Sequence, residues 1–392
     1  MTAGKREKAL EQRRLPKIRL AIGLVSAVIV AALFMTPSFA PWLLRFEYST
    51  ADWRTAFLSE HAATQHPKIA LVVINDETLK DYPSSPVDRG LLSKIVRALD
   101  AAGARAIGLD ILFLKKTDPE RDQQLLDTLH EVKTPIVLGA LDQRGDLKDY
   151  QQQFQTSFLQ MTNRPVGYLN LRHERDDVVR YTASPAPQSL YPKSFARLLA
   201  ETAGVTAADK GEPIAWILAP SDGSDTFLKI PAQDLIENTQ SAANGQLPTP
   251  KMISLLSDRI VLVGGDFPLR DRHRTPLSVR HGETIPGVAI HAYVLAGMLD
   301  PARAISELSP GQARLLLMSL AVLGFLLGWL LWRSTVVEFL GWGTATAILI
   351  AVDAFCFKEF NLLLPFTLAL VAWVAGLTAG KSLRFVATSY AH

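Results

Sequence analysis

Four carboxylates follow or interrupt short apolar runs along the chain: Asp76, Glu77, Asp110 and Asp266. In parallel α/β sheets, ligands collect beyond the carboxyl ends of the strands. If these runs are neighbouring strands, several carboxylates approach one crevice, where a divalent cation with oxygen ligands could sit. Alternatively, Asp110 caps a buried backbone group and the others are solvated turn residues, because their spacing matches no known metal loop. The sequence therefore leaves the metal open and predicts no other cofactor.

A basic loop comes directly after Asp266 and contains Arg270, Arg272, His273 and Arg274. Such a cluster could bind an anion, a carboxylate ligand or lipid head groups. Its more ordinary role is to pair with the acidic loops named above. We therefore add Arg272, His273 and Arg274 to the candidate ligand-binding residues. His291 follows an apolar helical pattern, which favours a hydrogen-bonded packing residue over a ligand.

No catalytic motif supports an enzyme. The glycines of Val263-Gly264-Gly265-Asp266 lack both Walker A spacing and the GxGxxG pattern. No GxSxG, HExxH or nucleophile–base pair is present. We expect a binding protein and assign no catalytic residue.

The candidate residues must be positioned by regular secondary structure. Apolar runs that alternate with helical patterns predict strands alternating with helices along the chain. Continuous apolar strands between helices indicate a parallel sheet covered on both faces. The fold class is therefore α/β, with a mainly parallel sheet flanked by helices in a single domain, whose middle section (142–250) is less regular. The predicted strands are Lys68–Asn75, Arg105–Phe113, Thr134–Leu141, Pro165–Leu171, Pro213–Leu218 and Arg259–Gly264.

Helix signals lie between these strands. Ser85-Pro86-Val87-Asp88 has the pattern of an N-cap, a first-turn proline and an acidic third residue. Asp118-Pro119 opens a second helix in a similar way. Tyr191–Thr202 and Val288–Leu299 have helical apolar spacing.

Composition narrows the class of protein. The net charge of +3 and the absence of a long basic stripe argue against nucleic acid as a partner. The single cysteine, Cys356, lies in an apolar run, so the polar region can have neither a disulfide framework nor a cysteine metal site. The α/β domain must be stable through core packing alone.

Long apolar segments predict a multi-pass membrane protein. The first, within 18–40, follows seven basic residues and could be a signal peptide or an uncleaved anchor. We favour the anchor, because Pro41 directly follows the one small-x-small site, Ser38-Phe39-Ala40. Three more segments have about the 20 residues that a helix needs to cross a bilayer, namely 313–332, 339–357 and 361–380.

Charge placement predicts the orientation of these four spans. The basic N-terminus (1–17) and the tail (381–392), which carries Lys381 and Arg384, are expected in the cytoplasm. Residues 41–312 then lie outside the cytoplasm. The predicted location is the inner membrane of a bacterium.

Glycine pairs and one acidic residue mark the predicted spans. Gly324, Gly328, Gly376 and Gly380 form two GxxxG patterns, which allow close helix approach. Packing within this chain's own bundle is favoured over dimerisation or a partner helix. Asp353 lies near the outer end of its span, where Lys358 could neutralise it, and a structural role is favoured over a functional one.

Five segments, in order, resemble the second type of CHASE domain, an extracellular sensory module associated with bacterial cyclases and histidine kinases. They are IALVVINDET, AAGARAIGLDILF, DDVVRY, RIVLVGG and PGVAIHAYVLAGML, and the resemblance covers about Phe46 to Leu299. The family also shows one span before the domain and three after it. Its members commonly continue into a cytoplasmic output domain, whereas only residues 381–392 follow the last predicted span here.

The resemblance implies a sensor or receptor subunit that responds to an unknown signal or partner. We expect the C-terminal spans to relay that response to an effector in trans. The expected partners are then the lipid membrane, a protein effector and, in a homo-oligomer, a second copy of the chain. The alternative is a structural or docking subunit of a multiprotein envelope complex, and a third interpretation is an extracytoplasmic hydrolase or binding protein.

Overall fold

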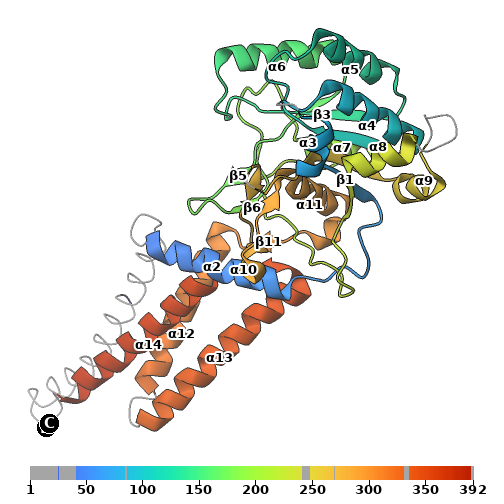
Figure 1. Cartoon of the computed structure of the whole chain (residues 1–392). Coiled ribbons are helices and arrows are strands. Elements are labelled where there is room, and N and C mark those ends of the chain that lie inside the picture. The colour runs from blue at the N-terminus through green and yellow to red at the C-terminus, as the bar shows by residue number, and fades with distance from the viewer. Residues whose placement is uncertain are drawn as a thin grey trace, which may run out of the picture. The chain divides into compact units, whose positions relative to one another are not determined.

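A computed structural model describes Val25 and residues 41–83, 86–240, 248–268, 270–330 and 335–389. The chain divides into two compact units (Figure 1). We call Ser59–Ile305 the α/β unit. The helical unit contains the described residues of Met1–Leu58 and Ser306–His392. The predicted N-terminal span (18–40) lies, except for Val25, outside the described residues.

The α/β unit is built on a six-stranded sheet in which every pairing is parallel, as predicted. The strand order is β4-β3-β2-β8-β1-β7, so β8, which comes last in the chain, lies between β1 and β2. The strands are β1 (Ile69–Ile74), β2 (Ala106–Asp110), β3 (Ile136–Ala140), β4 (Val166–Tyr168), β7 (Leu228–Pro231) and β8 (Ile260–Gly265).

Helices cover both faces of this sheet. On one face lie α4 (Arg89–Ala101), α5 (Pro119–Glu131), α6 (Asp149–Thr162), α8 (Ala232–Gln240) and α9 (Pro250–Leu256). On the other lie α7 (Phe195–Thr202) and α11 (Gly287–Leu299). The remaining short elements are α3 (Asp76–Asp81), α10 (Ser278–His281), η1 (Pro301–Arg303), and the ribbons β5 (Arg172–His173) with β6 (Val179–Tyr181) and β9 (Arg272–His273) with β10 (Ile285–Pro286).

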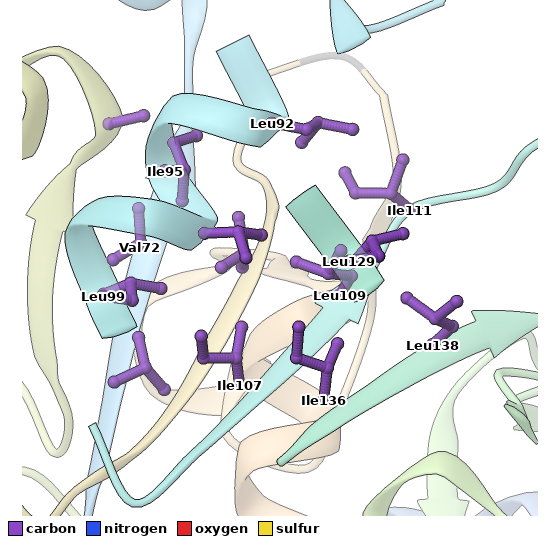
Figure 2. Close-up of a cluster of buried hydrophobic side chains, with 14 of the residues drawn as sticks. Val72, Leu92, Ile95, Leu99, Ile107, Leu109, Ile111, Leu129, Ile136 and Leu138 are labelled. Atoms are coloured by element: carbon purple, nitrogen blue, oxygen red, sulfur yellow. The ribbon is translucent and has the colours of Figure 1, made fainter. Parts of the chain in front are cut away.

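The core explains why the apolar runs form strands. Alternate residues of β1 pack into two separate clusters, one on each face, so the whole run IALVVI is buried. Figure 2 shows the cluster on the α4 face, where Leu92, Ile95 and Leu99 lie over Ile107 of β2 and Val72 of β1. Burying a leucine or isoleucine side chain stabilises the fold by about 1.5–3 kcal/mol.

Two local predictions were wrong. Pro213–Leu218 is not a sheet strand: it makes isolated bridges at its ends, while Ile214, Trp216 and Ile217 pack into the cluster beneath α11. The N-cap of α4 is Asp88, not Ser85, and its Oδ1 accepts a hydrogen bond from the Leu91 N–H at 2.8 Å. In contrast, Asp118 caps α5 ahead of Pro119, as predicted.

The helical unit contains three helices that are long and apolar enough to cross a membrane. The apolar spans are Pro310–Leu330 in α12 (Pro310–Leu330), Phe339–Phe360 in α13 (Thr335–Phe360) and Phe366–Phe385 in α14 (Phe366–Ser389). The unit also contains α2 (Pro41–Leu58) and a short ribbon of β11 (Ser306–Glu307) and β12 (Leu362–Leu363).

The four glycines of the GxxxG patterns lie where α12 meets α14. A Cβ added to Gly324 would meet the Trp373 carbonyl oxygen at 2.5 Å, and one added to Gly328 would meet the Leu377 backbone. Gly376 and Gly380 face the α12 backbone in the same way. The two backbones touch at these positions, so no side chain fits between them.

Asp353 pairs with Arg54 of α2 rather than with Lys358, which is exposed. The prediction of Lys358 as its partner was therefore wrong. The Arg54 guanidinium also donates to the Leu364 carbonyl at 3.0 Å. The contact joins α2 to the end of α13 and to the segment before α14.

Replacing Gly376 with leucine is expected to force α14 away from α12, because the new side chain would enter space occupied by the Ala321 backbone. Overpacking of a close contact costs about 1–3 kcal/mol. Gly343→Leu on α13 is the matched control, since a Cβ there meets nothing within 4 Å. The measurement is the aggregation temperature of the full-length protein in detergent. Equal aggregation temperatures for the two variants would contradict the packing role.

Candidate functional site

The insertion of β8 between β1 and β2 creates the crevice that holds the candidate site. After β1 and β2, the chain passes to α4 and α5 on one face of the sheet. After β8, it passes to α11 on the opposite face. Adjacent strands whose connections leave toward opposite faces open a crevice at their carboxyl ends.

A cleft of about 1200 Å³ lies at this edge of the sheet. Its volume lies slightly above the usual range of small-molecule sites, about 300–1,000 Å³. Most of its wall is apolar, with leucines, Ile111, prolines and Phe267. Its polar residues are Asp110, Arg144, Asn170, Arg172, His173, Ser184, Arg270, Asp271, His273 and His291.

Close packing of α11 against the sheet shapes the floor of the cleft. Gly264 of β8 is the register partner of Asp110 on β2. A Cβ at Gly264 would lie 2.6 Å from the Val288 Cβ and 3.3 Å from the Asp110 Cβ. Only glycine therefore allows α11 to approach at this point.

Asp110 is the most perturbed acid of the α/β unit among the described residues. Burial raises the pKa of its carboxyl well above 3.8, and the nearby Asp271 carboxylate adds to the effect. Its side chain makes no hydrogen bond or ion pair with any residue in the described part of the chain. An unpaired acid with a raised pKa at the floor of a cleft is typical of functional sites.

His291 lies on α11 and also lines the cleft. It is 6% exposed, and its ring meets the Phe195 ring edge-on at 5.5 Å between centroids. Burial lowers the pKa of His291 to about 4, so its imidazole is neutral near pH 7. The side chain is thus both a packing residue, as its sequence context suggested, and part of the cleft.

Asp271 and His273 lie beside the first turn of α11. The Asp271 carbonyl accepts a hydrogen bond from the Gly287 N–H at 3.1 Å, and a Cβ at Gly287 would lie 3.0 Å from the Asp271 carboxylate. The position of this carboxylate at a helix N-terminus is electrostatically favourable. Its Oδ1 is 3.2 Å from Nε2 of His273, whose ring is 5.1 Å from that of His173.

The residues of the predicted basic loop have different roles in the structure. Arg272 pairs with Asp266 and donates a hydrogen bond to Thr284 Oγ1 at 3.1 Å. These contacts connect the end of β8 to the segment before β10. Arg274 is exposed and does not line the cleft. Arg270 is exposed at the cleft wall, and its side chain has no ion-pair partner among the residues that the structure describes.

The structure brings together only part of the predicted set. Asp110 and His273 line the cleft, and Asp266 and Arg272 form an ion pair near it. Asp76 and Glu77 are exposed in the first turn of α3, where Glu77 pairs with Lys80 at 2.7 Å, and neither lines the cleft. In the described ranges, no three His, Cys, Asp or Glu side chains are placed to hold a metal ion.

Sequence reasoning missed Asp271, His173 and Arg144 as cleft residues. Arg144 pairs with Asp142 and donates to the Ser184 carbonyl at 2.7 Å. Its position directly after the predicted third strand was a usable signal, because that strand ends at the same edge of the sheet. Asp271 has a left-handed backbone (φ 53°), which no sequence pattern indicated.

The fold and cleft define an α/β unit with a small-molecule-sized site, attached to helices that could span a membrane. A family model, described as the CHASE2 domain, matches residues 25–332. The chain belongs to this family of extracellular sensory domains, as its sequence resemblance implied. No curated protein and no solved structure matches the chain.

Replacing Asp110 with asparagine is expected to stabilise the α/β unit near neutral pH. A carboxyl whose folded pKa is raised binds its proton more tightly when folded, so the wild type loses stability as pH rises above 3.8 toward the folded pKa. Asparagine does not ionise, so the variant avoids this pH-dependent loss of stability, and its side chain has nearly the same volume as aspartate.

The measurement is thermal unfolding of both full-length proteins in detergent, at pH 4 and pH 7. The difference in midpoint should be small at pH 4 and should favour Asp110→Asn at pH 7. A variant that is less stable than wild type at pH 7 would show that the carboxylate is ionised and paired.

Proposed function

We propose that this chain is a membrane-anchored sensory receptor whose α/β unit binds a small molecule in the cleft at the carboxyl edge of its sheet. The observation that carries the proposal is the unpaired, desolvated Asp110 at the floor of that cleft. Desolvating a carboxyl without a partner costs stability. A ligand that supplies the missing hydrogen bond would recover part of that cost.

The cleft lining favours a ligand with an apolar body and one anionic group. The apolar walls of the cleft can pack against the apolar part of such a ligand. Neutral His291 and the Asp110 carboxyl, whose pKa is raised by burial, offer hydrogen bonds to a ligand. Arg144, Arg172 and Arg270 are exposed cations at the wall, and the first two are paired with Asp142 and Glu174. Arg270 has no ion-pair partner among the described residues, and a guanidinium binds carboxylate or phosphate in a two-pronged manner. We propose binding alone, without a chemical step and without a metal or other cofactor.

Connectivity supports a route for the signal. α11 carries His291 at the cleft, and only residues 300–309 separate α11 from α12. A ligand shifts a receptor between two states by its differential affinity for them. We propose that a change in α11 passes along the chain to α12–α14 and from there to an effector protein in trans. The proposed location is a bacterial inner membrane, with both termini in the cytoplasm.

The test is a thermal-shift screen of the full-length protein in detergent with small organic acids of graded apolar size. At a ligand concentration 100 times the Kd, binding is expected to stabilise the folded state by roughly 2.7 kcal/mol. Arg270→Gln should lose the shift, whereas Arg274→Gln, an arginine in the same loop outside the cleft, should keep it.

A shift that survives Arg270→Gln equally well would contradict the proposed ligand class. If no ligand is found and a partner protein co-purifies in fixed stoichiometry whatever is added, the docking-subunit alternative replaces the receptor.

A further inference from the structure

One face of α2 exposes aromatic side chains to the surroundings. Trp42, Phe46, Trp53 and Phe57 are 55%, 58%, 59% and 47% exposed. Their spacing of i, i+4, i+11 and i+15 places them in one stripe along the helix. Neighbours in this aromatic stripe touch: the Trp53 and Phe57 rings stack with centroids 4.8 Å apart, and the Trp42 and Phe46 rings meet edge-on at 6.2 Å.

The opposite face of α2 buries polar residues. Asp52, Arg54 and Thr55 are only 6%, 7% and 3% exposed. A helix on the surface of a soluble protein has the reverse arrangement, with apolar residues inside and polar ones outside. Leu43 and Ala56 of α2 are buried as well, but its four large aromatic side chains are exposed while charged side chains are buried. This arrangement favours a surrounding that is not water.

Hydrogen bonds hold α2 at the ends of two candidate spans. Arg54 pairs with Asp353 near the end of α13, which finishes at Phe360. One oxygen of Glu47 accepts a hydrogen bond from the Leu368 N–H at 3.2 Å in the first turn of α14. Within the helical unit, α2 therefore runs across these helix ends (Figure 1). Where helices of this length cross a bilayer, their ends lie where the hydrocarbon core gives way to head groups.

The chemistry of the stripe fits that level. Tryptophan is enriched at membrane–water interfaces, because its ring is apolar and its N–H needs a polar partner. Arg45 is exposed on the same face and can meet lipid phosphates. Among the described exposed residues of α2, none is acidic. α13 also exposes large apolar side chains, including Phe355 and Phe360.

We propose that α2 is an interfacial helix, whose aromatic stripe is embedded at the boundary between head groups and acyl chains of the bilayer. Such helices lie in the plane of the membrane with one apolar face buried in it. Polar side chains on the buried face of α2 contact α13 and the first turn of α14. The chain therefore enters the α/β unit at Ser59 directly from a helix that rests on lipid.

The experiment places a nitroxide spin label on the stripe of the full-length protein in vesicles of phosphatidylcholine and phosphatidylglycerol. The single native cysteine is removed by Cys356→Ala, and labels are attached in the variants Phe46→Cys and Trp53→Cys. The control is Leu190→Cys, which is 67% exposed in the α/β unit. Collision rates are measured with oxygen, which prefers lipid, and with a water-soluble nickel complex.

Labels on the stripe are expected to show a higher ratio of oxygen to nickel collisions than the label at residue 190. A ratio equal to that of the control would overturn the proposal, because the stripe would then face water. Dipolar broadening that disappears when labelled protein is diluted with unlabelled protein would also overturn it, because a second copy would then cover the stripe.

A second measurement needs no cysteine and changes the helix little. Brominated lipids quench tryptophan fluorescence, and bromines high on the acyl chain report the interface. The double variant Trp42→Phe, Trp53→Phe should lose quenching by shallow bromines relative to wild type. Trp216→Phe, which alters a buried tryptophan of the α/β unit, should leave that quenching unchanged. Unchanged shallow quenching in the double variant would contradict the interfacial position.

Discussion

The burial of the central strands on both faces is the constraint on which the rest of the α/β unit depends. Because β1, β2 and β8 are covered by helices above and below, polar side chains can leave these strands only at their ends. β8 lies between β1 and β2, and the helix that follows β8 packs on the opposite face of the sheet from the helices that follow β1 and β2. The cleft opens at the carboxyl ends of these strands. Asp110 ends a buried strand, and its register partner Gly264 allows Val288 of α11 to pack closely beside it. This close packing explains the burial that raises the pKa of Asp110.

Much of this fold could be predicted from the sequence, because continuous apolar runs such as Lys68–Asn75 have few alternatives to a buried parallel strand. The order of the strands could not be predicted, since β8 pairs with β1 although the paired residues, such as Ile69 and Ile260, lie far apart in the chain. The pairing uses backbone groups that every sequence shares. Pro213–Leu218 shows the limit of the same rule: its apolar residues are buried, yet they pack beneath α11 without joining the sheet.

The sequence predicted a ligand site at the carboxyl ends of the strands, and the structure brings only some of the predicted residues to the cleft there. Asp76 follows β1 as expected, yet the α3 helix begins at that residue and turns its first carboxylates to solvent. Asp110 and His273 reach the cleft because β2 and the β9–β10 ribbon end beside α11. The burial of polar side chains on α2 could not be predicted from the sequence either. It depends on the ion pair between Arg54 and Asp353, which lie 299 residues apart in the chain.

The connections of the α/β unit suggest why the helical unit is packed so tightly. The chain enters that unit from α2 and leaves it toward α12. Under the proposed receptor function, a rearrangement at the cleft would reach the helical unit through these two connections. At the α12–α14 contact, Gly324 and Gly376 leave backbone against backbone, without side chains whose rotamers could absorb a shift. A displacement of α12 must then carry α14 with it or break the contact. Because packed interfaces switch between discrete arrangements rather than deform continuously, a glycine contact of this kind is suited to transmit a small movement.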